Sequence, residues 1–329
     1  HPNSTSLISP RDDLPKANEP VEPSTDYQRF LGLCSHEYFH SCLVKFIRPE
    51  NFVNYDLNKE GYTSLLWIFE GFTSYYDDLI LLRSGVINQE SYIKLLKLQI
   101  DRYLQNPGRA VQTVAESSFD AWVKFYRQDE NSNNAGTSYY NKGCLVALCL
   151  DLGLRLRGSS LDELMRKLYE NAQNGIQVNE RTIYELANDL TGDDWSEQIN
   201  HLINTTDEFP LDQLFPEFGL SYALNHDKSL PFGLKLADKP EGVLIQSARR
   251  DGLGVLVGLS ANDVIVAIDG LKATAKLVEK YAKQDGTYIV YAFRRDEFMQ
   301  FEVKASGSAL TEVNLKVEDQ AKVEKWLKA

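Results

Sequence analysis

Apolar and polar residues follow two different patterns along the chain, and the pattern changes near residue 229. Between residues 27 and 228, apolar side chains recur at helical spacing over long stretches that contain few prolines. This spacing predicts helices over residues 27–47, 62–84, 89–104, 120–126, 138–156, 160–172 and 179–190. Residues 24–26 offer N-cap side chains to the first helix, and Gly85 is a natural C-cap for the second.

From residue 232 onward, the apolar residues fall in short runs instead. These runs predict strands over residues 233–236, 242–248, 263–268, 288–294 and 299–304, with a helix over 273–284. At the other end of the chain, five prolines in the first 25 residues break any helical period. The sequence therefore predicts an extended lead-in (1–26), a helical domain (27–228), a small α+β domain (229–306) and a tail with a short helix (307–329).

Composition and charge narrow the class of protein. A chain of 329 residues with 43% hydrophobic and 25% charged residues is typical of a globular protein of about two domains. The net charge of −12 argues against nucleic acid as a partner, and no apolar run reaches the roughly 20 residues of a membrane span. Four cysteines are too few for a disulfide scaffold. We expect a soluble protein, cytoplasmic or periplasmic, and the sequence does not decide between these compartments.

The first predicted helix contains a pattern that is typical of a metal site. His36 and His40 lie four residues apart, with Glu37 directly after the first of them. This spacing places both imidazoles on one helix face, where a tetrahedral Zn²⁺ can take a nitrogen from each. In zinc peptidases with this His-Glu-x-x-His pattern the Glu is the general base, which is the role we predict for Glu37. Two hydrogen-bonded histidines in a core helix are the structural alternative.

A catalytic zinc takes a third protein ligand, and Glu70 is the candidate. It stands in a strongly apolar helical stretch, where a carboxylate is costly to bury unless a metal or a partner balances it. A Glu in an ordinary salt bridge is the alternative. His201 and His226 are rival ligands, each alone in a polar stretch. Asp77 and Ser74 are candidates for orienting the two histidines.

The segments HEYFH at residues 36–40 and FEGFTSYYDD at 69–78 resemble the glycyl aminopeptidase family of gluzincin zinc metallopeptidases, distant relatives of aminopeptidase N. The resemblance covers about residues 30–305 and implies a mostly helical, thermolysin-like catalytic domain with one Zn²⁺ per chain and Glu70 as its third ligand. It also implies β-rich domains upstream. The chain is therefore expected to be the C-terminal portion of a longer enzyme, with the residues that bind the substrate α-amine before residue 1.

Two further assignments follow from resemblance. The segment YNKG at residues 140–143 is similar to one that carries an oxyanion-stabilising tyrosine in the aminopeptidase N relatives. The resemblance implies that role for Tyr140, and Tyr139 is the next choice for it. The alternative is that Tyr140 is an aromatic residue that serves only packing. Residues 232–270 resemble a PDZ domain of the protease-associated type. This implies a peptide-binding loop at Phe232, Gly233 and Leu234, whereas a module kept only for packing is the alternative.

Together these patterns predict an α+β zinc metallopeptidase. Glu37 would take a proton from the zinc-activated water and pass it to the leaving amine, and Tyr140 would stabilise the oxyanion. The resemblance implies an aminopeptidase that prefers small N-terminal residues such as Gly and Ala. The alternatives are an endopeptidase, or a peptide-binding PDZ module on a catalytically weak scaffold. Peptides or proteins are the expected substrates, and a peptide ligand is a possible partner of the PDZ-like domain.

Overall fold

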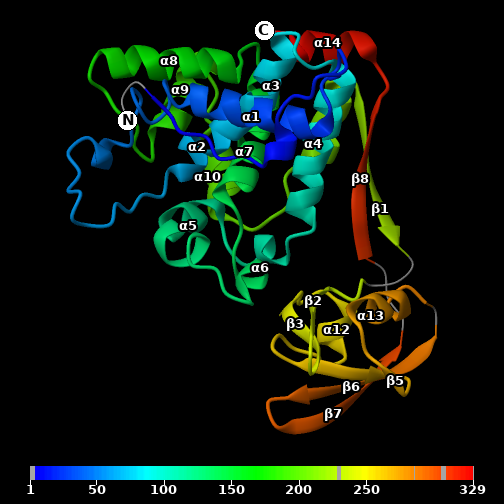
Figure 1. Cartoon of the computed structure of the whole chain (residues 1–329). Coiled ribbons are helices and arrows are strands. Elements are labelled where there is room, and N and C mark those ends of the chain that lie inside the picture. Colours follow the sequence, from blue (N-terminus) through cyan, green and yellow to red (C-terminus); the bar gives the residue numbers. More distant parts are fainter. Residues whose placement is uncertain (1–3, 228–230, 285, 305–308, 329) are drawn as a thin grey trace.

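The computed structural model describes residues 4–227, 231–284, 286–304 and 309–328, and it has an α+β fold. Figure 1 shows a block of helices and a smaller module of strands, with the strands β1 and β8 running side by side between them. The helices of the block are α1 (Thr25–Phe39), α2 (Leu66–Phe69), α3 (Gly71–Arg83), α4 (Gln89–Leu104), α5 (Val114–Phe119), α6 (Ser132–Ala135), α7 (Tyr139–Arg155), α8 (Leu161–Gln173), α9 (Thr182–Thr191), α10 (Ser196–Asn204) and α11 (Leu211–Glu217).

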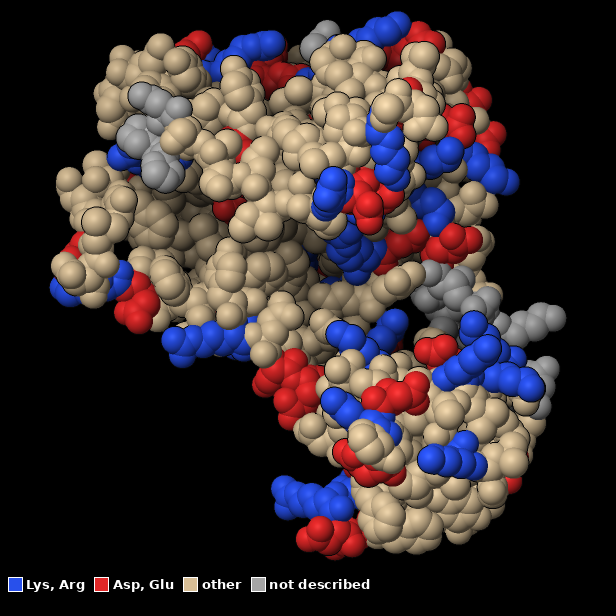
Figure 2. Space-filling model, viewed as in Figure 1, with Lys and Arg blue, Asp and Glu red and all other residues tan. Residues whose placement is uncertain are grey.

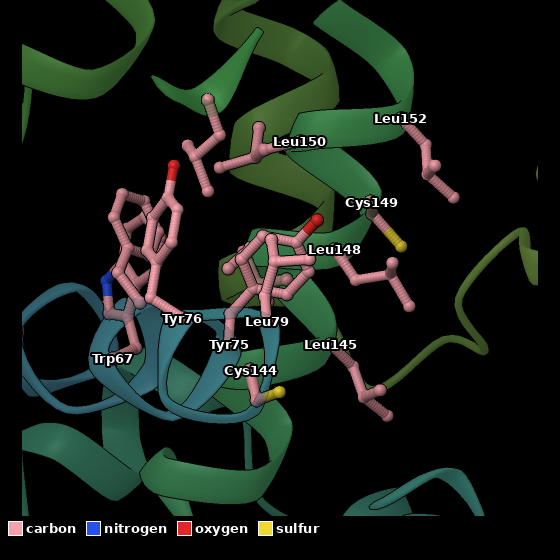
Figure 3. Close-up of a cluster of buried hydrophobic side chains, with 14 of the residues drawn as sticks. Trp67, Tyr75, Tyr76, Leu79, Cys144, Leu145, Leu148, Cys149, Leu150 and Leu152 are labelled. Carbon is pink, nitrogen blue, oxygen red and sulfur yellow. The ribbon is translucent and has the colours of Figure 1, made fainter. Parts of the chain in front are cut away.

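The helix α7 forms the centre of the helical block. Its residues from 141 to 154 are all buried, and most of them are apolar, so this helix contacts neighbours on every side. Figure 3 shows aromatic and leucine side chains of α2 and α3, among them Trp67, Tyr75 and Leu79, packed beside the leucines and cysteines of α7. All four cysteines are free thiols.

Two glycines bring α3 and α7 into backbone contact. A Cβ atom added to Gly71 would lie 2.5 Å from Cα of Gly143, which is far inside van der Waals distance. A Cβ atom added to Gly143 would lie 2.8 Å from the carbonyl oxygen of Trp67. Because Gly71 directly follows Glu70 and Gly143 lies three residues after Tyr140, this contact sets the spacing between two predicted site residues.

The predicted helix over residues 27–47 is wrong beyond Phe39. The chain leaves α1 through a series of turns, in which Val44 has a φ of 82°, and Leu43 and Ile47 form an isolated bridge. Leu43 and Ile47 are fully buried, so their apolar character is explained by core packing without helical backbone. Ser24 caps the helix through its side chain, and α1 starts at Thr25, two residues before the predicted start.

The predicted helix over residues 62–84 is two helices, α2 and α3, which meet at Glu70. Glu70 has a φ of −103°, away from the value of an ideal helix. The predicted helix over residues 120–126 contains a π-helix, η4 (Ala121–Phe125), directly after α5. Four helices of the block, α5, α6, α10 and α11, lie outside the helices predicted from the sequence. The remaining predicted helices agree with the structure to within a few residues.

The strand module has its own core. Its strands are β2 (Leu234–Lys239), β3 (Gly242–Ala248), β4 (Val264–Ile268), β5 (Leu271–Lys272), β6 (Thr287–Arg294) and β7 (Glu297–Lys304), and its helices are α12 (Leu253–Leu256) and α13 (Ala275–Tyr281). The strand order is β2-β3-β4-β6-β7, antiparallel throughout, with β5 paired to β4. Val243, Ile265, Val290 and Val303 are fully buried between the sheet and its helices.

The last strand and helix return to the helical block. The strand β1 (Leu220–Asp227) pairs antiparallel with β8 (Ala309–Val317), and α14 (Gln320–Leu327) follows. Val323 and Trp326 of α14 are buried in the core of the helical block, beside Phe215 and Phe218. Residues 309–327 therefore contribute packing to the first part of the chain, across the inserted strand module.

One loop of the helical block contacts the strand module directly. The side chain of Asn134, in α6, donates to the carbonyl oxygen of Ala248 at 2.7 Å and accepts from the backbone N–H of Arg250 at 2.8 Å. Asn262 also donates to Glu130, at 3.2 Å. Acidic and basic side chains are interspersed on the face of the module shown in Figure 2. Within the described part of the chain, no helix combines the length and apolar character needed to cross a lipid bilayer.

Candidate metal centre and active site

Three predicted metal ligands come together at the ends of helices. His36 lies in the last turn of α1, His40 is its C-cap, and Glu70 lies at the junction of α2 and α3. The Oε2 atom of Glu70 is 3.3 Å from Nε2 of His36 and 3.2 Å from Nε2 of His40. One ligand atom from each residue lies within 4.8 Å of the other two. Among the described residues, these three form the group of His, Cys, Asp or Glu side chains that could hold a metal ion.

The two distances from Glu70 to the histidines fit a tetrahedral metal ion. With metal–ligand bonds of about 2.0–2.1 Å, neighbouring ligand atoms of a tetrahedral zinc site are separated by about 3.3–3.4 Å. The two Glu70 to histidine separations are within about 0.2 Å of that edge length. Two imidazole nitrogens and one carboxylate oxygen are also a donor set of catalytic zinc sites, which leave a fourth position open.

Second partners orient the two imidazole rings. Nδ1 of His36 lies 3.3 Å from Oδ2 of Asp77, and Nδ1 of His40 lies 3.3 Å from the carbonyl oxygen of Leu43. In both rings the Nε2 atom is therefore directed to Glu70, as a metal ligand requires when the other nitrogen is hydrogen-bonded. Asp77 is one of the two residues that the sequence predicts for this role. Ser74, the other candidate, instead accepts a hydrogen bond from the thiol of Cys144 through its carbonyl oxygen.

Charges in the cluster are strongly coupled. Burial lowers the pKa of His36, but hydrogen bonds with Asp77 and Glu70 outweigh burial and raise this pKa to about 9. Burial raises the pKa of Glu70, whereas hydrogen bonds from His36 and His40 lower it to about 2. The protein without metal thus holds a carboxylate next to an imidazolium, and a metal ion binding there must displace the imidazolium proton.

Glu37 faces the same cavity as the three ligands. The cavity has a volume of about 950 Å³, and it is lined by His36, Glu37, His40 and Glu70 together with residues 4–7 of the lead-in. The hydroxyl of Thr5 donates a hydrogen bond to Oε2 of Glu37 at 3.3 Å. Glu37 is therefore in the position of a carboxylate that can exchange a proton with a group bound in the cavity.

Tyr140 also lines this cavity, whereas Tyr139 does not. The ring of Tyr140 lies 6.1 Å from that of His36, and Tyr139 is 1% exposed beneath it. Burial, together with the nearby Glu70 carboxylate, raises the pKa of Tyr140 far above its usual value, so the phenol keeps its proton. A protonated phenol beside the ligand cluster is a hydrogen-bond donor for an oxyanion.

Tyr126 is a site residue that the sequence analysis missed. Its hydroxyl lies 3.4 Å from the hydroxyl of Tyr140 and accepts from that of Tyr139 at 3.3 Å. It follows the π-helix η4, a backbone form that occurs often at functional sites. A single Tyr in the run AWVKFY carries no recognisable motif, so only the register of η4 could have revealed it.

The remaining candidates lie apart from the cluster. His201 is half exposed on α10, where it lies 3.5 Å from Asp207, and His226 is exposed on β1. In the strand module, Phe232 is buried in the second core, and Gly233 has a φ of 71°. The carbonyl oxygen of Gly233 accepts from the N–H of Arg249, and Leu234 starts the edge strand β2.

A family profile described as M61 glycyl aminopeptidase matches residues 29–146. These residues include all three candidate ligands, Glu37 and Tyr140. The part of the chain that carries the candidate site belongs to the M61 glycyl aminopeptidase family. The resemblance to this family found in the sequence is thereby confirmed for residues 29–146.

One solved structure is similar to the whole of this chain. An aminopeptidase N family protein from Idiomarina loihiensis is 37% identical, with a TM-score of 0.89, over 100% of this chain and 60% of that chain. This chain therefore spans less than two thirds of that relative. A serine endoprotease from Yersinia pestis is 15% identical over 24% of this chain and 29% of that chain. An HtrA3 PDZ domain bound to a phage-derived ligand is 11% identical over 29% of this chain and 92% of that chain. Both TM-scores are 0.21, which is too low to support an argument. A search of curated proteins found no match.

Proposed function

We propose that this M61-family chain is a zinc-dependent aminopeptidase that prefers small N-terminal residues such as Gly and Ala. The observation that carries the proposal is the His36, His40 and Glu70 cluster, in a cavity that Glu37 and Tyr140 also line. Its two Glu70–histidine distances match the edge of a tetrahedral zinc site. A zinc ion bound there would supply a Lewis acid for the scissile carbonyl and an acidified water. The preference for Gly and Ala rests on the family.

The residues of the chain would divide the chemistry between them. Glu37 would accept a proton on its carboxylate and pass it to the leaving amine, and Thr5 would hold that carboxylate through the hydrogen bond to Oε2. Tyr140 would donate its phenolic proton in a hydrogen bond to the oxyanion, with Tyr126 orienting the hydroxyl. Asp77 would fix the tautomer and ring orientation of His36.

Zinc stoichiometry combined with substrate choice tests the proposal. We expect one zinc per chain, and hydrolysis of Gly- and Ala-arylamides but not of N-blocked peptides. Cleavage of blocked peptides alone would assign an endopeptidase instead, and a zinc-free, inactive protein would favour the peptide-binding module.

Two substitutions separate chemistry from metal binding. Glu37→Gln should retain zinc and lose turnover by at least about 10²-fold, because the amide cannot accept the proton. Glu70→Ala should lose zinc on dialysis, because two imidazoles remain as ligands. A Glu37→Gln variant with near-normal kcat would exclude Glu37 as the general base.

A further inference from the structure

A second cavity adjoins the candidate metal centre on the other side of Glu70. Its volume is about 820 Å³, and Glu70 lines both cavities. One wall is the loop of residues 51–62, and the other is formed by η4 and the residues around it. We call its apolar lining, formed by Tyr55, Leu57, Tyr62, Trp122 and Tyr126, the aromatic groove. Figure 2 shows a hollow with mainly uncharged walls between the projecting loop and the body of the helical block.

The apolar side chains of the aromatic groove are uncovered to an unusual degree. Leu57 is 85% exposed, Tyr126 65%, Tyr55 60% and Trp122 51%. Grouped exposed apolar side chains of this kind mark ligand grooves and interfaces more often than packing surfaces. Side chains this exposed contribute little to the stability of the fold, so we infer that they serve binding rather than packing.

Hydrogen bonds hold the two walls in place. Trp122 donates from its indole Nε1 to the carbonyl oxygen of Gly61 at 3.0 Å, which ties η4 to the loop. Asn51 donates to the carbonyl oxygen of Tyr62 at 2.7 Å, within the loop itself. The groove is therefore formed before a ligand binds. The entropic cost of ordering its walls on binding is small.

Two residues connect the aromatic groove with the candidate metal centre. Glu70 separates the two cavities, and the Tyr126 hydroxyl contacts that of Tyr140. A peptide whose scissile carbonyl lies beside Glu70 and Tyr140 therefore places one neighbouring residue in the larger cavity and the other at the groove. On the proposed function, the residue before the scissile bond is small and has no use for a large aromatic site.

We propose that the aromatic groove binds the substrate side chain that directly follows the scissile bond, and that it selects aromatic or large aliphatic side chains there. This inference rests on the proposed aminopeptidase activity. Lys59 pairs with Asp56 at 3.6 Å, and the other charged residues of the lining, Glu60 and Glu70, are both acidic, so the groove offers no free cation to an acidic side chain. Selection is therefore by apolar contact and stacking.

Two isomeric dipeptide amides test the proposal. Ala-Phe-NH₂ and Phe-Ala-NH₂ have the same composition, and only the first places Phe after the scissile bond. Binding is measured by calorimetry with the zinc-loaded Glu37→Gln variant, and kcat/KM with the unmodified chain, with Ala-Gly-NH₂ as reference. We expect Ala-Phe-NH₂ to bind at least about tenfold more tightly than Ala-Gly-NH₂, because burial of a Phe side chain supports a factor of that order. Phe-Ala-NH₂ should show no such gain.

A double variant locates the effect. Tyr55→Ser combined with Leu57→Ser changes two exposed side chains, so the fold should be kept. We expect this double variant to reduce the affinity ratio of Ala-Phe-NH₂ to Ala-Gly-NH₂ at least about fivefold, with the affinity for Ala-Gly-NH₂ itself unchanged. Phe298→Ala, an equally exposed aromatic in the strand module, is the matched control and should change nothing.

The outcomes separate the two proposals. Equal affinity for Ala-Phe-NH₂ and Ala-Gly-NH₂, or a Phe advantage that survives the double variant, overturns the assignment of the groove. A tenfold affinity difference without hydrolysis of any amide overturns the proposed function and supports the groove as a site for an apolar side chain.

Discussion

The contact between Gly71 and Gly143 makes a ranked prediction about stability and metal binding. An alanine at Gly71 would place its Cβ 2.5 Å from two backbone carbons of Gly143, and an alanine at Gly143 would place its Cβ 2.8 Å from a backbone oxygen. Ordinary contacts lie at 3.4–4 Å, so about 1 Å of separation between α3 and α7 would be needed. Backbone atoms cannot rotate out of the way, so the helices themselves must move.

The magnitude follows from two opposed terms. Overpacking a core costs about 1–3 kcal/mol, and occasionally more, whereas Gly to Ala within a helix gains about 1 kcal/mol of propensity. We expect a net loss of about 1–2 kcal/mol for Gly143→Ala and a larger loss for Gly71→Ala. Gly32→Ala, in α1, is the matched control, because its Cβ would meet a single side-chain oxygen of Asp78 at 3.3 Å. It should be close to neutral.

Urea denaturation of the three variants, combined with competition for zinc against a chelator, measures both effects. The movement that lowers stability also displaces Glu70 from the histidines. We therefore expect zinc affinity to be highest in Gly32→Ala, lower in Gly143→Ala and lowest in Gly71→Ala. Equal stability and equal zinc affinity of all three variants would refute the reasoning, since the backbone contact would then have no mechanical consequence.

Two further predictions concern polar groups on the helices α3 and α7. Asp77→Asn should weaken zinc binding about 10- to 100-fold in the chelator assay, because a carboxamide orients the His36 ring less well; an unchanged affinity would contradict this. Burial lowers the pKa of Lys142 to about 8, while its ammonium donates to the carbonyl oxygens of Arg109 and Gln112. Because the unfolded chain binds the Lys142 proton up to its ordinary pKa, the contribution of this group to stability rises between pH 8 and about 10.5. Compared with Lys142→Met in urea, the parent should gain roughly 2 kcal/mol between pH 7.5 and 9.5, and parallel pH profiles would exclude the effect.

Local patterns explain why the three residues of the candidate site, which the structure brings together, can be selected from the sequence. The two histidines are one helical turn apart, and this relation survives even though α1 ends at Phe39 and His40 is only its C-cap. Glu70 was selected by the cost of burying a carboxylate in an apolar run, and the structure does place it among buried residues with both imidazoles around it. Neither argument depends on where the helices begin or end.

Tertiary contacts explain what the sequence did not reveal. The continuous apolar run over residues 62–84 hides the break at Glu70, because both sides of the break are buried in the same core. The pairing of β1 with β8 joins segments on either side of the strand module, for example Leu220 with Val317, and no local period reports such a partner. Tyr126 and the aromatic groove depend on how η4 faces the loop of residues 51–62, which a single sequence does not encode in any short pattern.

The ends of two long helices give the site an electrostatic arrangement that suits the proposed chemistry. His36 and His40 lie at the C-terminal end of α1, where unpaired carbonyl groups carry partial negative charge and stabilise a cation by about 0.3–1 kcal/mol. Tyr140 is the second residue of α7, at an N-terminal end whose partial positive charge favours negative charge by a similar amount. The metal position and the oxyanion position therefore lie each at the helix end of the matching sign. The close approach of Gly71 to Gly143 keeps these two ends at a fixed spacing, so the variants that separate α3 from α7 should impair both halves of the site together.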